Sequence, residues 1–367
     1  MRRIVVGLPG REYPILIGEG VLSGAGRLID EVTPGGRRVV LADRQAFSHH
    51  GQSLMHSLRA AGHQTEVLTF AGGEEEKSLD GTVRLYRELS RIEAERQDVI
   101  LAFGGGVTGD LAGFVASTYL RGIPLVQIPT TLLAQVDSSV GGKVGINLGT
   151  WKNLIGSFYQ PRAVLADVGT LSTLPRSELA TGLAEVIKTA FLAGEEFLSY
   201  LEKNFSQLLA LEASVLEEVV EVCCRYKASI VEADERESSL RRVLNFGHTL
   251  GHAVEAATRF SWSHGEAVAA GMVFALEITA DRGAAKDALA RLFPLLAAAG
   301  LPAGLPDLDP DAVLEALRRD KKRQGGRITF VTLEAVGQPV FVEIGDEQLL
   351  EALSRHRKRA LEKGRVK

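Results

Sequence analysis

The sequence predicts an N-terminal α/β domain with a mainly parallel, Rossmann-like sheet, followed by a mainly α-helical C-terminal domain. Two observations support this fold class. Short β-branched runs alternate with helical patterns in the first half, and strand signals give way to long amphipathic stretches after Pro175. With 367 residues the chain is long enough for two domains, and we place them at 1–174 and 175–367.

The first-half elements follow one another as strand, helix and strand, a pattern that joins parallel strands and covers both faces of a sheet. The expected strands are Val39–Ala42, Glu66–Phe70, Val99–Phe103 and Leu125–Ile128, and the expected helices run through Leu54 and Leu58, over Leu79–Leu89 and over Gly109–Tyr119. In the second half we expect helices over Glu178–Leu192, Val215–Glu232, Leu240–Ala257 and Glu266–Asp281, and a hairpin of Arg327–Leu333 with Pro339–Glu343.

Composition and charge exclude several classes of function. A formal net charge of −4 provides no basic field, so we expect neither nucleic acid nor a membrane as a partner. The most apolar long window, Leu101–Leu120, contains Asp110 and several glycines and is not a membrane span. The two cysteines are adjacent and the N-terminal apolar run ends by Leu8, too short for a signal peptide, so we expect a cytoplasmic protein.

A glycine-rich turn, Gly104–Asp110, lies between an expected strand and an expected helix. Its spacing satisfies G-x-G-x-x-G, in which bare backbone N–H groups approach a pyrophosphate at the positive end of a helix. No acidic residue follows about 20 residues later to bind the ribose. Asp43, at the end of the Val39–Ala42 strand, is the better candidate. The competing interpretation is a tight turn without a ligand.

Two further polar segments follow expected strands, where open α/β sheets bind ligands. They are Gly73–Ser78, with Glu74 and Lys77, and Pro129–Thr131, with two threonines. Carboxylates, hydroxyls and an ammonium group suit the recognition of ribose and phosphate. Each segment is also compatible with a simple helix cap.

Carboxylate and imidazole groups cluster in the helical half. Glu185 and Lys188 share one helix face, His248 and His252 share another, and His264 opens the next helix. One carboxylate with two imidazoles is a common set of protein ligands for a catalytic zinc ion. The residues alone leave the pair of histidines undecided, and core histidines bonded to backbone carbonyls remain a competing interpretation.

The densest motif runs from Asp137 to Asn147 and continues over Lys152–Gly156. Paired glycines and the lysines Lys143 and Lys152 suit an oxyanion or a phosphate. Arg121, Lys227, Arg241 and the later pair Lys321-Lys322 add positive charge. These cations predict a substrate that carries several negative groups.

Taken together, these motifs resemble the 3-dehydroquinate synthase family of sugar phosphate cyclases. The resemblance extends from Asp43 to Lys322. The matching motifs occur in the family's order, as Gly104–Asp110, Asp137–Lys143, Lys152-Asn153, Gly182–Lys188, Asn245–His252 and His264–Glu266. We therefore expect the dehydroquinate synthase-like variant of the predicted fold.

The resemblance also implies cofactors and site residues. It implies one Zn2+ or Co2+ ion on Glu185, His248 and His264. It implies NAD+ held by Asp43, Glu74, Lys77, Gly105, Gly106, Val107, Asp110, Thr130, Thr131, Lys143, Lys152, Thr170 and Thr173. It implies substrate contacts and catalysis by His252, Lys143, Lys188, Lys227, Arg241, Asn245, Asp137, Asn153 and Arg121, the last reaching the phosphate across a homodimer interface.

The implied substrate is a phosphorylated sugar acid, 3-deoxy-D-arabino-heptulosonate 7-phosphate. The implied reaction combines transient NAD-dependent oxidation, β-elimination of phosphate, reduction and intramolecular aldol cyclisation, giving 3-dehydroquinate for aromatic amino acid biosynthesis. Val144 and Leu148–Trp151 depart from the family's pattern. The alternatives are another sugar phosphate cyclase of the deoxy-inosose or valiolone type, a metal-dependent polyol dehydrogenase, and a non-catalytic metabolite sensor.

Overall fold

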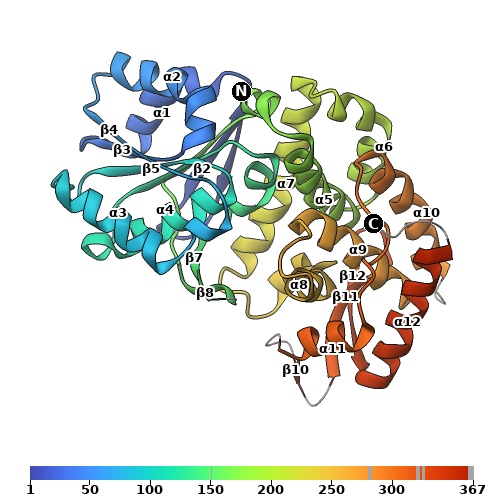
Figure 1. Cartoon of the computed structure of the whole chain (residues 1–367). Helices are drawn as coiled ribbons and strands as arrows, with labels where there is room; N and C mark the ends of the chain where they lie inside the picture. The colour runs from blue at the N-terminus through green and yellow to red at the C-terminus, as the bar shows by residue number, and fades with distance from the viewer. Residues whose placement is uncertain (150, 280–282, 320–322, 325–326, 363–367) are drawn as a thin grey trace. The chain divides into compact units, whose positions relative to one another are not determined.

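A seven-stranded sheet forms the centre of the first of two units in the computed structural model (Figure 1). The described residues are 1–149, 151–279, 283–319, 323–324 and 327–362. The first unit comprises Met1–Leu179 and Leu211–Arg236, and the second comprises Ala180–Ala210 and Glu237–Lys367. The domain boundary expected at 174/175 stays a prediction, because these units describe packing and not independent folding.

The sheet of the first unit has the strand order β1-β2-β9-β6-β5-β3-β4. All neighbouring pairs are parallel except β1 with β2. The strands are β1 (Arg2–Val6), β2 (Tyr13–Gly18), β3 (Arg38–Asp43), β4 (Thr65–Phe70), β5 (Val99–Gly104), β6 (Leu125–Pro129) and β9 (Ala163–Asp167). The predicted mainly parallel sheet is confirmed, and the four expected strands correspond to β3, β4, β5 and β6.

Helices cover both faces of this sheet, as the alternation of side chains along β5 shows. Val99, Leu101 and Phe103 pack with α1 and α2, whereas Ile100 and Ala102 pack with α3 and α4. Figure 1 shows these two pairs of helices on opposite sides of the sheet. The helices of the unit are α1 (Ala25–Val32), α2 (Arg44–Ala60), α3 (Leu79–Arg91), α4 (Gly106–Thr118) and α7 (Ala213–Ala233). Its short helices are η1 (Val21–Gly24), η2 (Glu74–Glu76), η3 (Tyr119–Arg121), η4 (Ala134–Ser138) and η5 (Val168–Thr173).

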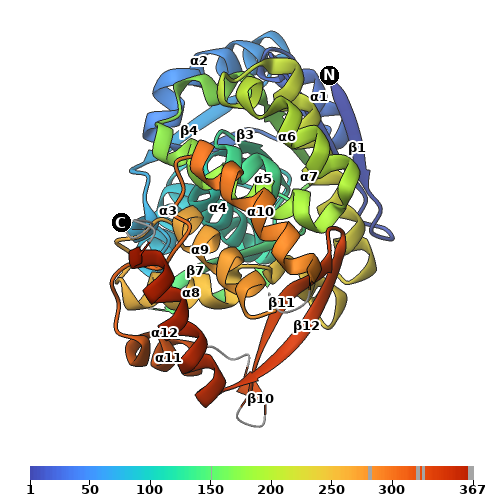
Figure 2. The same cartoon turned by 90° about the vertical axis from the view of Figure 1, so that its right-hand side faces the viewer.

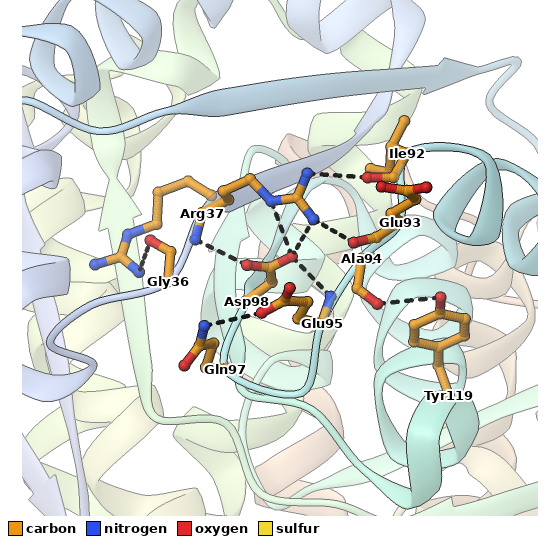
Figure 3. A network of polar contacts seen from close by, with 10 residues as sticks. Gly36, Arg37, Ile92, Glu93, Ala94, Glu95, Gln97, Asp98 and Tyr119 are labelled. Carbon is orange, nitrogen blue, oxygen red and sulfur yellow. Dashed lines mark hydrogen bonds and ion pairs between the residues drawn. The ribbon is translucent and has the colours of Figure 1, made fainter.

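A buried ion pair fixes the amino ends of two central strands. Asp98, 2% exposed, accepts hydrogen bonds from the backbone N–H groups of Arg37 and Glu95, each at 2.9 Å. The Arg37 guanidinium donates to Asp98 and to the carbonyl oxygens of Ile92 and Glu93 (Figure 3). These bonds join the start of β3 to the loop that leads into β5, so both strands enter the sheet in a fixed register.

The segment with Lys143 and Lys152, for which the sequence analysis predicts no strand, forms an antiparallel strand pair, β7 (Lys143–Leu148) and β8 (Trp151–Phe158). Gly145 and Gly156 face each other in this pair. A Cβ at Gly145 would lie 2.7 Å from a backbone oxygen of β8, and one at Gly156 would lie 2.5 Å from a backbone oxygen of β7. Glycine is therefore required here, and its low β-propensity hides the strands from sequence analysis.

The second unit is mainly helical, as predicted. Its helices are α5 (Arg176–Ala193), which belongs to it from Ala180 onward, α6 (Glu195–Leu209), η6 (Leu240–Asn245), α8 (His248–Ala257), α9 (His264–Glu277), α10 (Gly283–Ala298), α11 (Pro310–Arg319) and α12 (Asp346–Glu362). The antiparallel sheet β10 (Arg323–Gln324), β11 (Arg327–Ala335) and β12 (Gln338–Gly345) is visible in Figure 2. Its β11–β12 pair confirms the expected hairpin.

The single helix expected over Leu240–Ala257 is wrong. The short helix η6 ends at Asn245, and α8 begins at His248 after Gly247, whose φ is 79°. A Cβ at Gly247 would lie 2.7 Å from the Val268 carbonyl oxygen, because α8 starts against α9. The left-handed glycine thus stops one helix and places His248 at the first position of the next.

Both cysteines, Cys223 and Cys224, are buried. Burial raises the pKa of the Cys224 thiol to about 12, so this thiol stays protonated, and its Sγ donates to the carbonyl oxygen of Gln135 at 3.1 Å. Among the described residues, no helix combines the length and the apolar character needed to cross a bilayer.

Candidate active site

Three side chains of the second unit converge at the starts of two helices. Glu185 lies within α5, His248 is the first residue of α8, and His264 is the first residue of α9. Each offers one ligand atom, and these atoms all lie within 4.8 Å of one another. The Nε2 atoms of His248 and His264 are each 3.4 Å from Oε1 of Glu185.

The surroundings of Glu185 fit a cation between these ligands. Its side chain is 1% exposed, and neither carboxylate oxygen has a hydrogen-bond partner within the described residues, although the Lys188 ammonium forms an ion pair with it. Burial alone would raise the pKa of Glu185, but Lys188 and the two histidines bring it well below its usual range. The group is therefore an anionic carboxylate with unsatisfied oxygens, which is what a divalent metal requires.

The two imidazoles differ in charge in the metal-free protein. Burial, assisted by Lys188, lowers the pKa of His248 well below its usual value, so this ring is neutral and ready to bind a metal. Burial also lowers the pKa of His264, but its interactions with the Glu185 and Glu255 carboxylates outweigh burial and raise the pKa to about 9. A bound metal ion would take the place of the His264 proton.

Contacts behind the ligands hold both rings in orientation. Nδ1 of His248 lies 3.1 Å from the Phe246 carbonyl oxygen, and Nδ1 of His264 lies 3.5 Å from Oε2 of Glu255. Such partners are typical of metal-ligating histidines. Sequence reasoning missed Glu255, which is 3% exposed. Its position seven residues after His248 on the same helix face was the available signal.

His252 stands apart from the group of ligand atoms. It follows His248 by one turn of α8, is exposed, and its ring centroid lies 5.4 Å from that of His248 and 6.4 Å from that of His264. Where the residues alone left the pair undecided, the geometry brings His248 and His264 to Glu185. His252 is left beside the site with a ring that can exchange protons.

The other predicted site residues of the second unit are mostly buried. Lys188 and Arg241 are each 2% exposed, and Arg241 lies in η6. Asn245, at the end of η6, donates from Nδ2 to Oε1 of Glu237 at 3.1 Å. The lysines at 321 and 322 lie outside the described residues.

The glycine-rich turn lies wholly in the first unit, at the carboxyl end of β5. Gly105 is the N-cap of α4, which begins at Gly106, three residues before the expected start. A Cβ added at Gly105 would lie 2.9 Å from Cγ2 of Thr131. One added at Gly106 would lie 3.0 Å from Oγ of Ser138. The bare backbone and the first-turn N–H groups, including that of Val107, form a cradle that fits a pyrophosphate.

Several predicted nucleotide contacts surround this turn. Lys77, 4% exposed, forms an ion pair with Asp110 on α4 at 2.5 Å. Burial raises the pKa of Asp110, and the Lys77 ammonium opposes that rise. Asp43 caps α2 by accepting from the Ala46 N–H at 2.8 Å, and Thr130 donates its N–H to the Gly104 carbonyl oxygen at 2.9 Å.

The remaining predicted contacts of the first unit lie on neighbouring segments. Thr131 precedes η4, whereas Thr170 and Thr173 lie in η5, where Thr170 accepts from Nε2 of Gln135 at 3.3 Å. Lys227 donates to the carbonyl oxygen and to Oδ1 of Asp137, both at 2.7 Å. The others are Glu74 in η2, Lys143 at the start of β7, Lys152 and Asn153 in β8, and Arg121 in η3.

The chain is similar throughout its length to known proteins. The family model described as 3-dehydroquinate synthase N-terminal matches residues 67–181, and the one described as 3-dehydroquinate synthase C-terminal matches residues 182–323. The 3-dehydroquinate synthase of Desulforamulus reducens is 44% identical over 358 residues, which cover 96% of this chain and 100% of that protein.

Two solved structures share the fold at 27% sequence identity. A 2-deoxy-scyllo-inosose synthase complexed with carbaglucose-6-phosphate, NAD+ and Co2+ matches with a TM-score of 0.87 over 97% of this chain and 100% of its own. The 2-epi-5-epi-valiolone synthase from Streptomyces hygroscopicus, with NAD+ and Zn2+ bound, matches with a TM-score of 0.86 over 95% of this chain and 97% of its own.

Proposed function

The chain belongs to the 3-dehydroquinate synthase family, and we propose that it converts 3-deoxy-D-arabino-heptulosonate 7-phosphate into 3-dehydroquinate and phosphate, a step of the shikimate pathway. The enzyme would then be a phosphate-eliminating carbon–oxygen lyase that depends on NAD+ and one divalent metal ion. The observation that carries the proposal is the Glu185–His248–His264 group, whose first two members are buried, in a chain that also carries a glycine cradle.

Glu185, His248 and His264 would hold the metal ion and leave a position open for substrate. The glycine cradle, with Asp43, Glu74, Lys77 and Asp110, would hold NAD+. When bound, NAD+ would supply an acceptor for a hydride from one carbon of the sugar and would later return it, and the metal would acidify the hydroxyl on that carbon, without net redox change. The two related cyclases with NAD+ and Co2+ or Zn2+ support this assignment.

The cations of the chain suit a substrate with a phosphate and a carboxylate. Lys188, Lys227 and Arg241 are buried, and buried ammonium and guanidinium groups attract anions more strongly than solvated ones. They would orient the substrate and stabilise the charge that develops during elimination. His252, exposed and one turn from a metal ligand, would move protons.

We propose a homodimer as the working form. Arg121 is exposed on η3, has a φ of 65°, and its guanidinium has no hydrogen-bond or ion-pair partner within the described residues. An exposed guanidinium of this kind can bind an anion at the site of a second copy of the chain. Light scattering should give twice the mass of one chain. A cytoplasmic location stays a prediction, supported by the two buried thiols.

The reaction itself is tested with metal-loaded protein, the heptulosonate phosphate and NAD+ at a small fraction of the substrate concentration. We expect phosphate and dehydroquinate in equal amounts, many equivalents for each NAD+, and no accumulation of NADH absorbance. NADH formed in step with substrate loss would contradict the proposal and indicate a polyol dehydrogenase.

A second substrate separates this function from that of the related cyclases. A hexose phosphate without the carboxylate should release phosphate at a small fraction of the rate, because Arg241 and the lysines would lack one of their anionic partners. Preferential turnover of that sugar would assign the chain to another sugar phosphate cyclase activity.

A further inference from the structure

We infer that Asn147 is a positioning residue that couples the Glu74–Lys77 segment to the Lys152-Asn153 segment, so that cofactor binding orders the substrate segment. The inference rests on the proposed function, in which the first segment contacts NAD+ and the second lies at the substrate. Asn147 belongs to the dense motif of the sequence, but neither the motif nor the resemblance gives it a role.

Three polar groups of Asn147 make hydrogen bonds that reach two separate segments. Its backbone N–H donates to the Lys77 carbonyl oxygen at 2.8 Å, and Nδ2 donates to Oε1 of Glu74 at 2.8 Å. Its Oδ1 accepts from the backbone N–H of Asn153 at 2.9 Å. Because the amide donates in one direction and accepts in the other, its orientation is fixed by the two segments together.

The backbone around Asn147 is irregular in a way that serves these contacts. The pairing of β7 with β8 shifts register between Ile146 and Leu148, where the single residue Asn147 lies opposite Lys152–Leu154, so the extra residues belong to β8. Asn153, in the middle of that extra stretch, has a φ of 53°, a left-handed conformation that asparagine adopts more readily than most residues. Bulges of this kind redirect the chain and its side chains near functional sites.

The contacts of Asn147 continue to the glycine turn. Lys77, whose carbonyl oxygen accepts from Asn147, pairs through its ammonium with Asp110 on α4. A continuous set of polar contacts therefore runs from the first turns of α4 through Lys77 and Asn147 to the backbone of Asn153. Glu74 and Lys77 are the two residues to which Asn147 donates hydrogen bonds. A cofactor that holds them in place therefore also holds Asn147 in place. By reciprocity, a substrate that holds Asn153 tightens cofactor binding.

The test is amide hydrogen exchange of the metal-loaded full chain with NAD+ alone, so that turnover is not needed. In the wild type, NAD+ should slow exchange at the glycine turn and should also slow exchange of the Asn153 amide about fivefold, the effect of one hydrogen bond. In Asn147→Ala, NAD+ should still protect the glycine turn but should leave Asn153 unchanged.

Two further variants separate coupling from loss of structure. Asn147→Asp keeps the acceptor for the Asn153 N–H but places a second carboxylate next to that of Glu74. The bond to Glu74 is lost, so NAD+ should no longer slow exchange of the Asn153 amide, which is the response of Asn153. Adding Glu74→Gln lets the side-chain amide at position 74 donate to the carboxylate at position 147. At NAD+ concentrations that protect the glycine turn, this double variant should restore the response of Asn153. Ser157→Ala is the matched control, because it removes the 2.8 Å bond from β8 to Ser117 and leaves Asn147 untouched.

The inference would be overturned if NAD+ slowed exchange of the Asn153 amide equally in the wild type and in Asn147→Ala. It would also be overturned if Ser157→Ala abolished this slowing. Protection of the glycine turn without protection of Asn153 in the wild type would also overturn it and would leave the cofactor proposal intact. No protection at the glycine turn would overturn the cofactor proposal, and the inference would fail with it.

Discussion

The Glu185 carboxylate shows how neighbours decide the chemistry of one residue. Within the part of the chain that the structure describes, its oxygens are buried without hydrogen-bond partners, yet Lys188 and two histidines keep the group ionised. Burying an anion whose oxygens lack hydrogen bonds lowers the stability of the folded state. Proteins keep such destabilising groups mainly at functional sites. The carboxylate, rather than the histidines, is therefore the strongest single indication of a metal site in this chain.

Glu255 should matter for metal binding although it is not a ligand. We expect Glu255→Ala to weaken Co2+ or Zn2+ binding roughly 10–100-fold, because His264 would lose the partner that orients its ring. Competition with a chelator measures the affinity. Glu277→Ala is the control, since Glu277 binds the buried ring of His356 at 2.7 Å, and His356 is not among the ligands. Equal losses in both variants would indicate general destabilisation.

At the scale of the helix, the start of α8 depends on one glycine, Gly247. Gly247→Ala should lower the free energy of unfolding by about 2–4 kcal/mol, because a Cβ would meet the Val268 carbonyl oxygen in a left-handed conformation. Gly300→Ala is the matched control, since Gly300 also has a positive φ, 71°, but nothing lies within 4 Å of its Cβ position. Denaturant titration of both variants gives the comparison, and equal losses would contradict the packing argument.

The Arg37–Asp98 pair should stabilise the sheet in a pH-dependent way. Burial would raise the pKa of Asp98, but hydrogen bonds from Glu95 and Arg37 lower it below its ordinary value of 3.8. Its stabilising contribution is thus complete at neutral pH and is lost as pH falls through the lowered pKa. We expect Asp98→Asn to cost about 1.5–3 kcal/mol at pH 7. The difference in unfolding free energy from the wild type should shrink below about pH 4. A difference that is constant down to pH 3 would contradict this.

The sequence predicts those helices and strands whose apolar residues form a clear pattern. Strand β5 is predicted by a continuous apolar run next to a glycine-rich turn, and helix α3 by apolar residues that recur at helical spacing. The pair β7–β8 was missed because glycines interrupt it, and the break before His248 was missed because apolar residues continue across Gly247. The sequence supplied the ligand types of the candidate site, but the choice between His252 and His264 depends on where separate helices begin.

At the scale of the whole molecule, the two cofactor regions belong to different units. The metal ligands lie in the second unit, whereas the glycine turn, Lys77 and Asp110 lie in the first. Each cofactor is therefore assigned to its own set of side chains, and removal of one set should leave the other set in place.

This independence is tested with one variant in each unit. His264→Ala should leave the NAD+ dissociation constant within about twofold of the wild type. Lys77→Met should weaken NAD+ binding at least about tenfold, through loss of a charge-assisted contact, and should retain the metal. Fluorescence titration gives the affinity and elemental analysis gives the metal content. Loss of both cofactors in either variant would contradict independent sites.

The central claim is that Glu185, His248 and His264, and not His252, hold one metal ion. Elemental analysis of purified His264→Ala and His252→Ala proteins, beside the wild type, tests it most directly. We expect one equivalent of divalent metal in the wild type and in His252→Ala, which should turn over slowly, and almost none in His264→Ala. Equal metal loss in both variants, or metal retained in His264→Ala, would contradict the account.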